Sequence, residues 1–150
     1  MQTNARVWRA AETNPVKRYL MEYHTLVCRR DALLLELERL REATQRVTSH
    51  MGAQRLSGLP NHNTQEDAML RVVDGQARLA QVVAHIDESL AVRLALIDRL
   101  QDERHKTLLT LRYIRGLTWE AIGYQMHYER TQVFEIHNTA LEEARGVMAG

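Results

Sequence analysis

Apolar residues recur at alternating spacings of three and four along two long stretches of the chain, a period typical of helices that pair along one stripe. The first stripe contains Tyr19, Tyr23, Leu26, Leu33, Leu37, Leu40, Val47 and Met51, with Arg30 and Thr44 as exceptions. The second contains Met69, Val72, Leu79, Val83, Ile86, Leu90, Ile97 and Leu100, with Gln76 and Arg93 as exceptions. The pattern predicts two long helices, over residues 15–51 and 64–101, each with one buried face.

Two glycines and a proline interrupt this period between the two stretches, which predicts a connecting loop over residues 52–62. Two amphipathic helices of similar length joined by such a loop bury each other's stripe most simply when they run antiparallel. We therefore expect an antiparallel helical hairpin over residues 15–101, preceded by an N-terminal arm over residues 1–14. No proline or glycine separates the second helix from the next segment, so it could continue into that segment.

A different pattern follows over residues 102–150, where three short apolar stripes are separated by tight polar breaks. The stripes are Leu108, Leu111 and Ile114; Trp119, Ile122 and Met126; and Val133, Ile136, Ala140 and Leu141. Short helices joined by tight turns are typical of a helix-turn-helix unit. The fold class we predict is all-α, a long antiparallel hairpin followed by a C-terminal three-helix helix-turn-helix unit.

Small and polar residues mark where these helices begin and end. The expected N-terminal caps are Asn14, Asn63 (with Thr64 as the alternative), Asp102 and Thr118. Gly116 stands where a helix commonly ends in a left-handed residue. Gly123 lies on the inner side of its helix, where a missing side chain lets backbones approach closely.

The last third of the chain resembles region four of bacterial sigma factors, the domain that reads promoter DNA beside RNA polymerase. The resemblance is carried by Leu109-Thr110-Leu111-Arg112-Tyr113, Thr118-Trp119-Glu120-Ala121-Ile122-Gly123, Arg130, Val133, Ile136 and Ala140-Leu141. With the preceding hairpin, the whole chain looks like the sigma-factor-like regulators encoded by phages and prophages. The resemblance implies a sequence-specific, DNA-binding transcription regulator that acts in the cytoplasm of a bacterial host cell.

Carried over by this resemblance, the groove-facing residues belong to the last of the three helices. They are Arg130, Thr131, Phe134 and Glu135, with Gln132 and Asn138 adjacent. Arginine can pair with guanine, glutamine with adenine, and phenylalanine can touch a thymine methyl group. His127, Tyr128 and Lys106 are the expected phosphate contacts.

The turn and the recognition helix depart from the family's usual residues. His127 stands where a glycine is usual, which predicts a positive φ at a non-glycine residue. Glu129 replaces a serine cap, and Phe134 and Glu135 replace a common arginine and glutamine. These changes predict a preference for different DNA or a reduced affinity.

The overall charge is +1, and residues 102–145 contain six basic and seven acidic residues, or −1 before any histidine is protonated. Phosphate contact must therefore depend on local arrangement. The single cysteine, Cys28, excludes an internal disulfide, and a buried or half-buried thiol is the expected state. No phosphate-binding glycine loop, nucleophile elbow or metal-binding spacing is present in the sequence, so we expect neither an enzyme nor a cofactor. No stretch has the length and apolarity of a membrane span.

The hairpin has more apolar surface than its two helices can cover, which favours a homo-oligomer, most simply a dimer, and leaves RNA polymerase as a further partner. Two other functions remain open from the sequence. A phage DNA-packaging subunit of the small-terminase kind would also join such helices but form a ring. A helical adaptor that contacts only proteins would bind no duplex.

Overall fold

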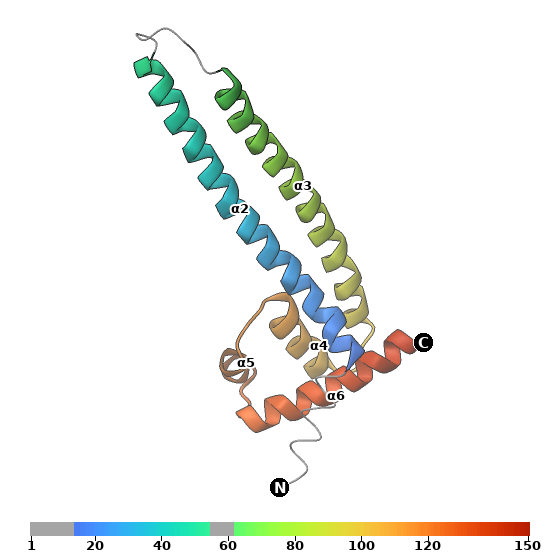
Figure 1. Ribbon diagram of the computed structural model, residues 1–150. Helices are drawn as coiled ribbons and strands as arrows, with labels where there is room; N and C mark the ends of the chain where they lie inside the picture. The colour runs from blue at the N-terminus through green and yellow to red at the C-terminus, as the bar shows by residue number, and fades with distance from the viewer. Residues whose placement is uncertain (1–13, 55–61) are drawn as a thin grey trace. The chain divides into compact units, whose positions relative to one another are not determined.

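The computed structural model describes residues 14–54 and 62–150, which are helical with short connections and contain no strand over these ranges. The predicted arm up to residue 13 and most of the predicted loop lie outside the described residues. The first two helices are α2 (Pro15–Gln54) and α3 (His62–Asp98), and the last two are α5 (Trp119–Met126) and α6 (Arg130–Ala149). Between them, α4 (Glu103–Leu109) continues directly into a π-helical segment, η1 (Thr110–Ile114) (Figure 1).

The helices begin close to the predicted residues because local side chains bind their free N–H groups. Asn14 accepts a hydrogen bond from the Val16 N–H at 2.9 Å, and Pro15 opens α2. Asp102 and Thr118 cap α4 and α5 in the same way. The cap predicted at Asn63 or Thr64 is wrong, because α3 already begins at His62. The continuation of α3 is also wrong, since that helix ends at Asp98 and α4 begins after a break.

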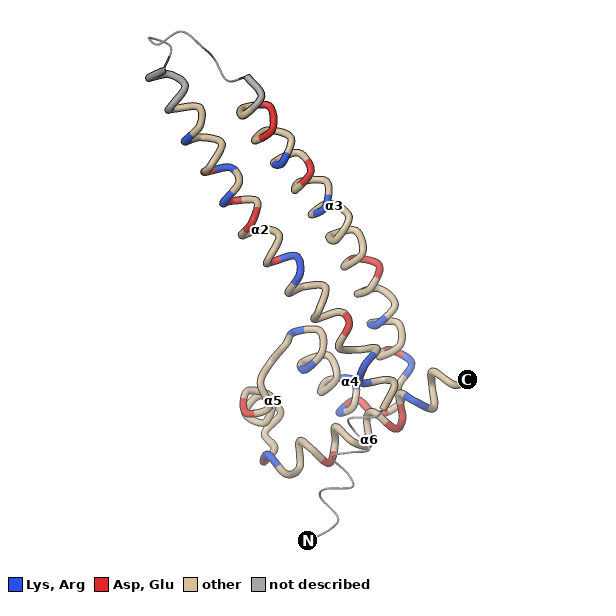
Figure 2. The backbone as a smooth tube through the Cα atoms, viewed as in Figure 1, with Lys and Arg blue, Asp and Glu red and all other residues tan. Residues whose placement is uncertain are grey.

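The chain forms two compact units, one made of residues 14–25 with Ile86–Gly150 and the other of Leu26–His85. We call the first the C-terminal unit. Lys and Arg are interspersed with Asp and Glu along α2 and α3, so neither helix carries one sign of charge along its whole length (Figure 2). Among the described residues no helix is long and apolar enough to cross a membrane.

In the Leu26–His85 unit, the stripe predicted on α2 is the less exposed face of the helix from Leu26 to Val47. The stripe predicted on α3 is partly wrong, because Met69 and Val83 are exposed. The less exposed residues of α3 here are Gln65, Ala68, Val72, Gly75, Leu79 and Val82. A methyl group added at Gly75 would lie 3.3 Å from a Leu37 methyl carbon, so the small residue allows a close approach between the helices.

Several large apolar residues of this unit remain exposed, as expected for two long helices that have more apolar surface than they can cover. They are Leu34, Leu35, Met69, Leu70, Val73 and Val83. Cys28 is exposed as well, so the expectation of a buried or half-buried thiol is wrong.

The core of the C-terminal unit is built from all its helices. Its fully buried centre consists of Leu20, Leu100, Leu108, Leu109, Ile122, Val133 and Leu141. Leu20 and Val16 bring the start of α2 into this core. Here the second predicted stripe is confirmed, since Ile86 and Ile97 of α3 are buried, as is Leu100 just after the end of that helix.

Arg93, an exception in the apolar stripe of α3, is buried against the start of α2. Its guanidinium donates to the Tyr19 carbonyl at 2.9 Å, to the Ser89 hydroxyl at 2.6 Å and to Glu22 at 3.0 Å. The same group lies 4.1 Å from the centre of the Tyr19 ring. A buried charge is tolerated only when its donors are bound, and this set of acceptors fixes one position of α3 relative to the first turns of α2.

Candidate nucleic-acid interface

The turn between α5 and α6 is short because Gly123 of α5 and His127, directly after α5, allow the chain to reverse sharply. His127 ends α5 in the left-handed region, with φ 61° and ψ 40°, which confirms the predicted positive φ. The Tyr128 N–H donates to the Gly123 carbonyl at 3.0 Å. A Cβ at Gly123 would lie only 2.8 Å from the Tyr128 carbonyl oxygen, so this position requires glycine. The close neighbour of Gly123 is thus the turn itself.

Helix α6 begins with a capping box, in which the side chains of Glu129 and Gln132 each accept a hydrogen bond from the other residue's backbone N–H. Glu129 is the cap residue, and its N–H donates to the Gln132 side-chain oxygen at 3.1 Å. This bond uses one of the two lone pairs of the oxygen that Gln132 would present to an adenine, so it restrains the orientation of that amide.

One face of α6 is buried and the opposite face is open. Val133, Ile136 and Ala140 are buried in the core. Thr131, Glu135 and Asn138 are spaced by four and three residues, so they share the opposite face. Thr131 and Glu135 are exposed and Asn138 is half-buried. This face therefore combines hydroxyl, carboxylate and amide groups.

Phe134 lies at the edge of that face and is partly used for packing. Its ring centre is 5.0 Å from that of Trp119, which in turn contacts the His137 ring at 4.7 Å. The Arg130 guanidinium lies 5.6 Å from the Phe134 ring centre and is itself exposed. Phe134 is thereby held by α5, while Arg130 projects beside it.

Tyr128 and Lys106, which were predicted to contact phosphate groups, differ in how free their side chains are to do so. Tyr128 is half-buried against the core, and it also helps to raise the pKa of Arg104, after the larger effect of the hydrogen bond from Arg104 to Asp102. Lys106 lies on α4, where its ammonium group binds Glu103 at 3.1 Å. The structure thus gathers the predicted residues of the turn and of α6 in one region and leaves Lys106 on another helix.

The interior behind α6 contains a neutral polar pair. The Tyr113 hydroxyl and His137 Nε2 are 2.7 Å apart and buried. Burial raises the pKa of Tyr113 to about 12 and, together with the nearby cations Lys17 and Arg112, lowers the pKa of His137 to about 4. Both groups are uncharged near neutral pH, so the pair links η1 to α6 without a buried charge.

A second polar cluster ties α4 to the later part of α6. His105 binds Glu143 through Nδ1 and lies 3.1 Å from the Thr139 hydroxyl through Nε2. Glu143 also accepts from the Gln101 N–H, and these bonds lower the pKa of Glu143. The hydroxyl, imidazole and carboxylate are ordered as in a nucleophilic triad, but the Thr139 hydroxyl also bonds the carbonyls of its own helix. The arrangement is a link between helices.

Two features of this region do not appear among the predicted site residues. Tyr124 is 88% exposed on α5, although its position two residues after the buried Ile122 already indicates an outward side chain. Arg112 donates to the Leu117 carbonyl at 2.9 Å and lies 4.3 Å from the Trp119 ring centre. That role depends on a contact across a loop, which no helical period reveals.

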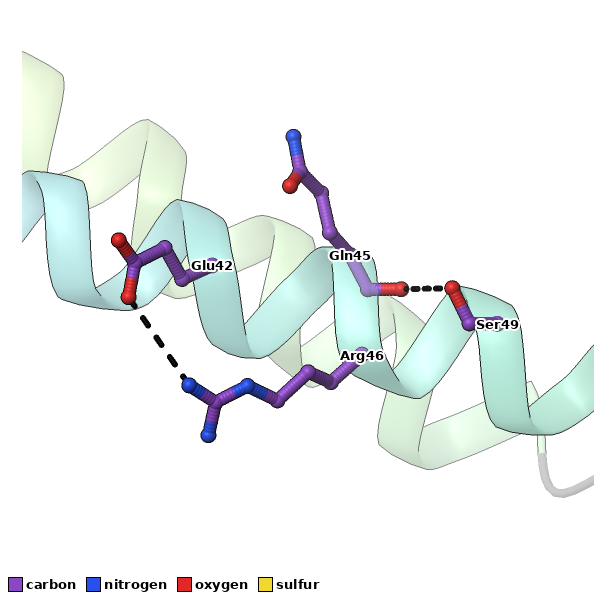
Figure 3. A pocket seen from close by; sticks show the side chains of 4 residues that line it. All are labelled: Glu42, Gln45, Arg46 and Ser49. Carbon is purple, nitrogen blue, oxygen red and sulfur yellow. Dashed lines mark hydrogen bonds and ion pairs between the residues drawn. The ribbon is translucent and has the colours of Figure 1, made fainter.

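A shallow hollow on α2 is lined by Glu42, Gln45, Arg46 and Ser49 (Figure 3). Glu42 and Arg46 pair with each other at 4.0 Å, and the Ser49 hydroxyl donates to the Gln45 carbonyl (Figure 3). Across residues 14–54 and 62–150, no group of three or more His, Cys, Asp or Glu is placed to hold a metal ion.

Comparison of the chain with models of protein families, with curated proteins and with solved structures finds no match.

Proposed function

We propose that this protein is a sequence-selective DNA-binding regulator of transcription, of the phage or prophage type, and that it reads duplex DNA with α6. In this proposal α4 with η1, α5 and α6 act as a helix-turn-helix unit. The single observation that carries it is the open face of α6, presented directly after a turn held tight by His127 and Gly123. A recognition helix needs such a face free of its own core.

The base-reading residues in this proposal are Arg130, Thr131 and Asn138. Arg130 is exposed at the first turn of α6, where side chains of a recognition helix meet base edges. Its guanidinium can form two parallel hydrogen bonds to guanine. Phe134, held by Trp119, contributes an apolar edge that suits a thymine methyl group.

The hairpin is proposed to run antiparallel and to join two copies. Gly75 of α3 lies close to Leu37 and Leu40, and Arg93 contacts Tyr19, which supports an antiparallel course for α2 and α3. The exposed Leu35 and Val73 support association through this part of the chain. A dimer would place two α6 helices on one duplex and favour a site with two-fold symmetry. RNA polymerase is the proposed further partner.

Selection of bound fragments from a pool of random-sequence duplexes tests this function. The full chain should enrich a defined site, and Arg130→Ala should reduce the ratio of affinities for that site and a scrambled duplex by roughly tenfold or more. Arg41→Ala removes an exposed arginine of the Leu26–His85 unit and is the matched control. A pool that stays unenriched, with no duplex bound at low salt, would rule out DNA recognition.

A protein-only adaptor is the second candidate, and one observation favours it. Glu135 and Glu142 are exposed and seven residues apart, so they share the open face of α6 and oppose a phosphate backbone. An adaptor would bind no duplex at any salt concentration. The same selection therefore separates the two functions.

A further inference from the structure

A basic surface lies at the loop between η1 and α5, where the first turns of α2 meet it. A Cβ at Gly116 would lie 3.6 Å from His24 Cε1, so this part of α2 packs on the loop. Lys17 precedes His24 by seven residues and is half-buried on the same face of α2. The Lys17 side chain is therefore directed to the side of α2 that carries the loop.

Two arginines at the end of η1 adjoin this loop. Arg112 holds the loop through the Leu117 carbonyl, at 2.9 Å, and by stacking on Trp119. Arg115 is exposed and directly precedes Gly116, which has a φ of 70°. Lys17 and Arg112 both lie close enough to His137 to affect its pKa, after the larger effect of burial, which agrees with their position around one loop.

Few carboxylates compete for these cations. Glu22, the next acid after Lys17 on α2, is bound to Arg93 at 3.0 Å. Neither Lys17 nor Arg115 has an ion-pair partner within residues 14–54 and 62–150. Glu120, in the first turn of α5, is the acid of this region. Three cations therefore adjoin this loop against one acid that is unpaired among the described residues, Glu120, in a molecule whose charges are otherwise nearly balanced.

We propose that Lys17, Arg112 and Arg115 form a second contact with the phosphate backbone of the duplex, separate from the base-reading face of α6. This inference rests on the proposed function. In a helix-turn-helix the helix before the recognition helix crosses the backbone, and here that helix is α5, which follows the loop beside these cations. Guanidinium groups suit phosphate oxygens because their donors form a planar fork. Lys17 extends this contact to α2, outside the three-helix unit.

Salt dependence of duplex binding measures such contacts, because each phosphate that is neutralised releases counterions. Lys17→Gln and Arg115→Gln, measured with the selected duplex, should each reduce the slope of log K against log salt by about 0.9. Each variant should weaken binding about three- to tenfold at low salt and leave the ratio between selected and scrambled duplex unchanged. Arg41→Gln, with the same loss of charge, should keep the slope of the unmodified protein.

Glu120→Gln is the control for poor folding, because a variant that gains affinity cannot owe its effect to a loss of structure. Removal of this carboxylate should increase the affinity for duplex about two- to fivefold. If the unmodified protein binds duplex but Lys17→Gln and Arg115→Gln keep its slope and Glu120→Gln changes nothing, the backbone contact is wrong and the proposed function stands. If the unmodified protein binds no duplex at low salt, both proposals fail.

Discussion

At the scale of single residues, His137 links the stability of the C-terminal unit to pH. Its pKa is lowered from 6.5 to about 4, mainly because the ring is buried beside Tyr113. Between these values the unfolded chain binds a proton that the folded chain does not bind, so folding loses stability as the pH falls from about 6.5 to about 4. The loss should reach at most about 3 kcal/mol.

Chemical denaturation at a series of pH values measures this loss. His137→Gln keeps a hydrogen-bonding partner for Tyr113 but cannot be protonated, so its free energy of unfolding should vary less between pH 6.5 and 4. An equal dependence in both proteins would assign the effect to other groups. Asp102, whose pKa is lowered to about 2 chiefly by its hydrogen bonds from Arg104, acts in a lower range, from 3.8 downward.

His127 is a second residue whose conformation has a cost. A non-glycine residue in the left-handed region lowers the free energy of unfolding by about 1 to 2 kcal/mol. Glycine avoids this strain but has a larger conformational entropy in the unfolded chain, so the substitution recovers only part of that amount. His127→Gly should therefore raise the free energy of unfolding by about 1 kcal/mol or less. Gly116→Ala, at a φ of 70°, should lower it by about 1 kcal/mol or more. Thermal unfolding of both variants checks the two opposite signs.

At the scale of helices, Arg93 decides how α3 meets the start of α2. Its side chain is 5% exposed whereas that of Glu22 is 62% exposed, so the two partners are not equivalent. Arg93→Met removes hydrogen bonds to Tyr19, Ser89 and Glu22 and should cost about 2 kcal/mol or more. Glu22→Gln disturbs only a solvent-screened ion pair and should cost less than about 1 kcal/mol. Similar losses from the two substitutions, measured by denaturant unfolding, would contradict this assignment.

Sequence patterns predict some features of these helices and miss others. The caps at Asn14, Asp102 and Thr118 could be predicted because each depends on atoms a few residues apart. The stripe of α3 was harder to predict, because the close contact of α3 with Leu37 is made at Gly75. A pattern of apolar residues does not include glycine. Hydrophobicity instead favours Met69 and Val83, which are exposed.

The candidate interface was predictable to a similar degree. The positive φ of His127 could be predicted because His127 stands at a turn position where the resembled family usually has glycine. The outward positions of Thr131 and Glu135 could be predicted from helical spacing. The π-helical segment and the use of Gln132 as a first-turn partner for Glu129 do not follow, because they depend on hydrogen bonds that residue type alone does not determine. The basic surface around the loop required the packing of His24 on Gly116.

At the scale of the whole molecule, the exposed apolar residues of the Leu26–His85 unit bear on assembly. We expect a dimer, because Leu35 and Val73 are 68% and 57% exposed and their burial against a second copy would be favourable. Sedimentation equilibrium of the full chain should give twice the chain mass of 17.4 kDa. The double substitution Leu35→Glu and Val73→Glu should shift the protein toward monomer while helix content is retained.

Three other results of that measurement would change the account. A large ring would favour the packaging subunit over the regulator. A monomer at all concentrations would contradict association through these residues. Dimers that persist in the double variant would move the interface to another surface.

The central claim is that duplex DNA meets the open face of α6, and amide chemical shifts of the full chain, recorded during titration with the selected duplex, test it most directly. We predict that the largest changes fall on residues 127–138, with smaller changes near Lys17 and Arg115 and little change at residues 30–45. Changes confined to the Leu26–His85 unit, or none at low salt, would contradict the claim.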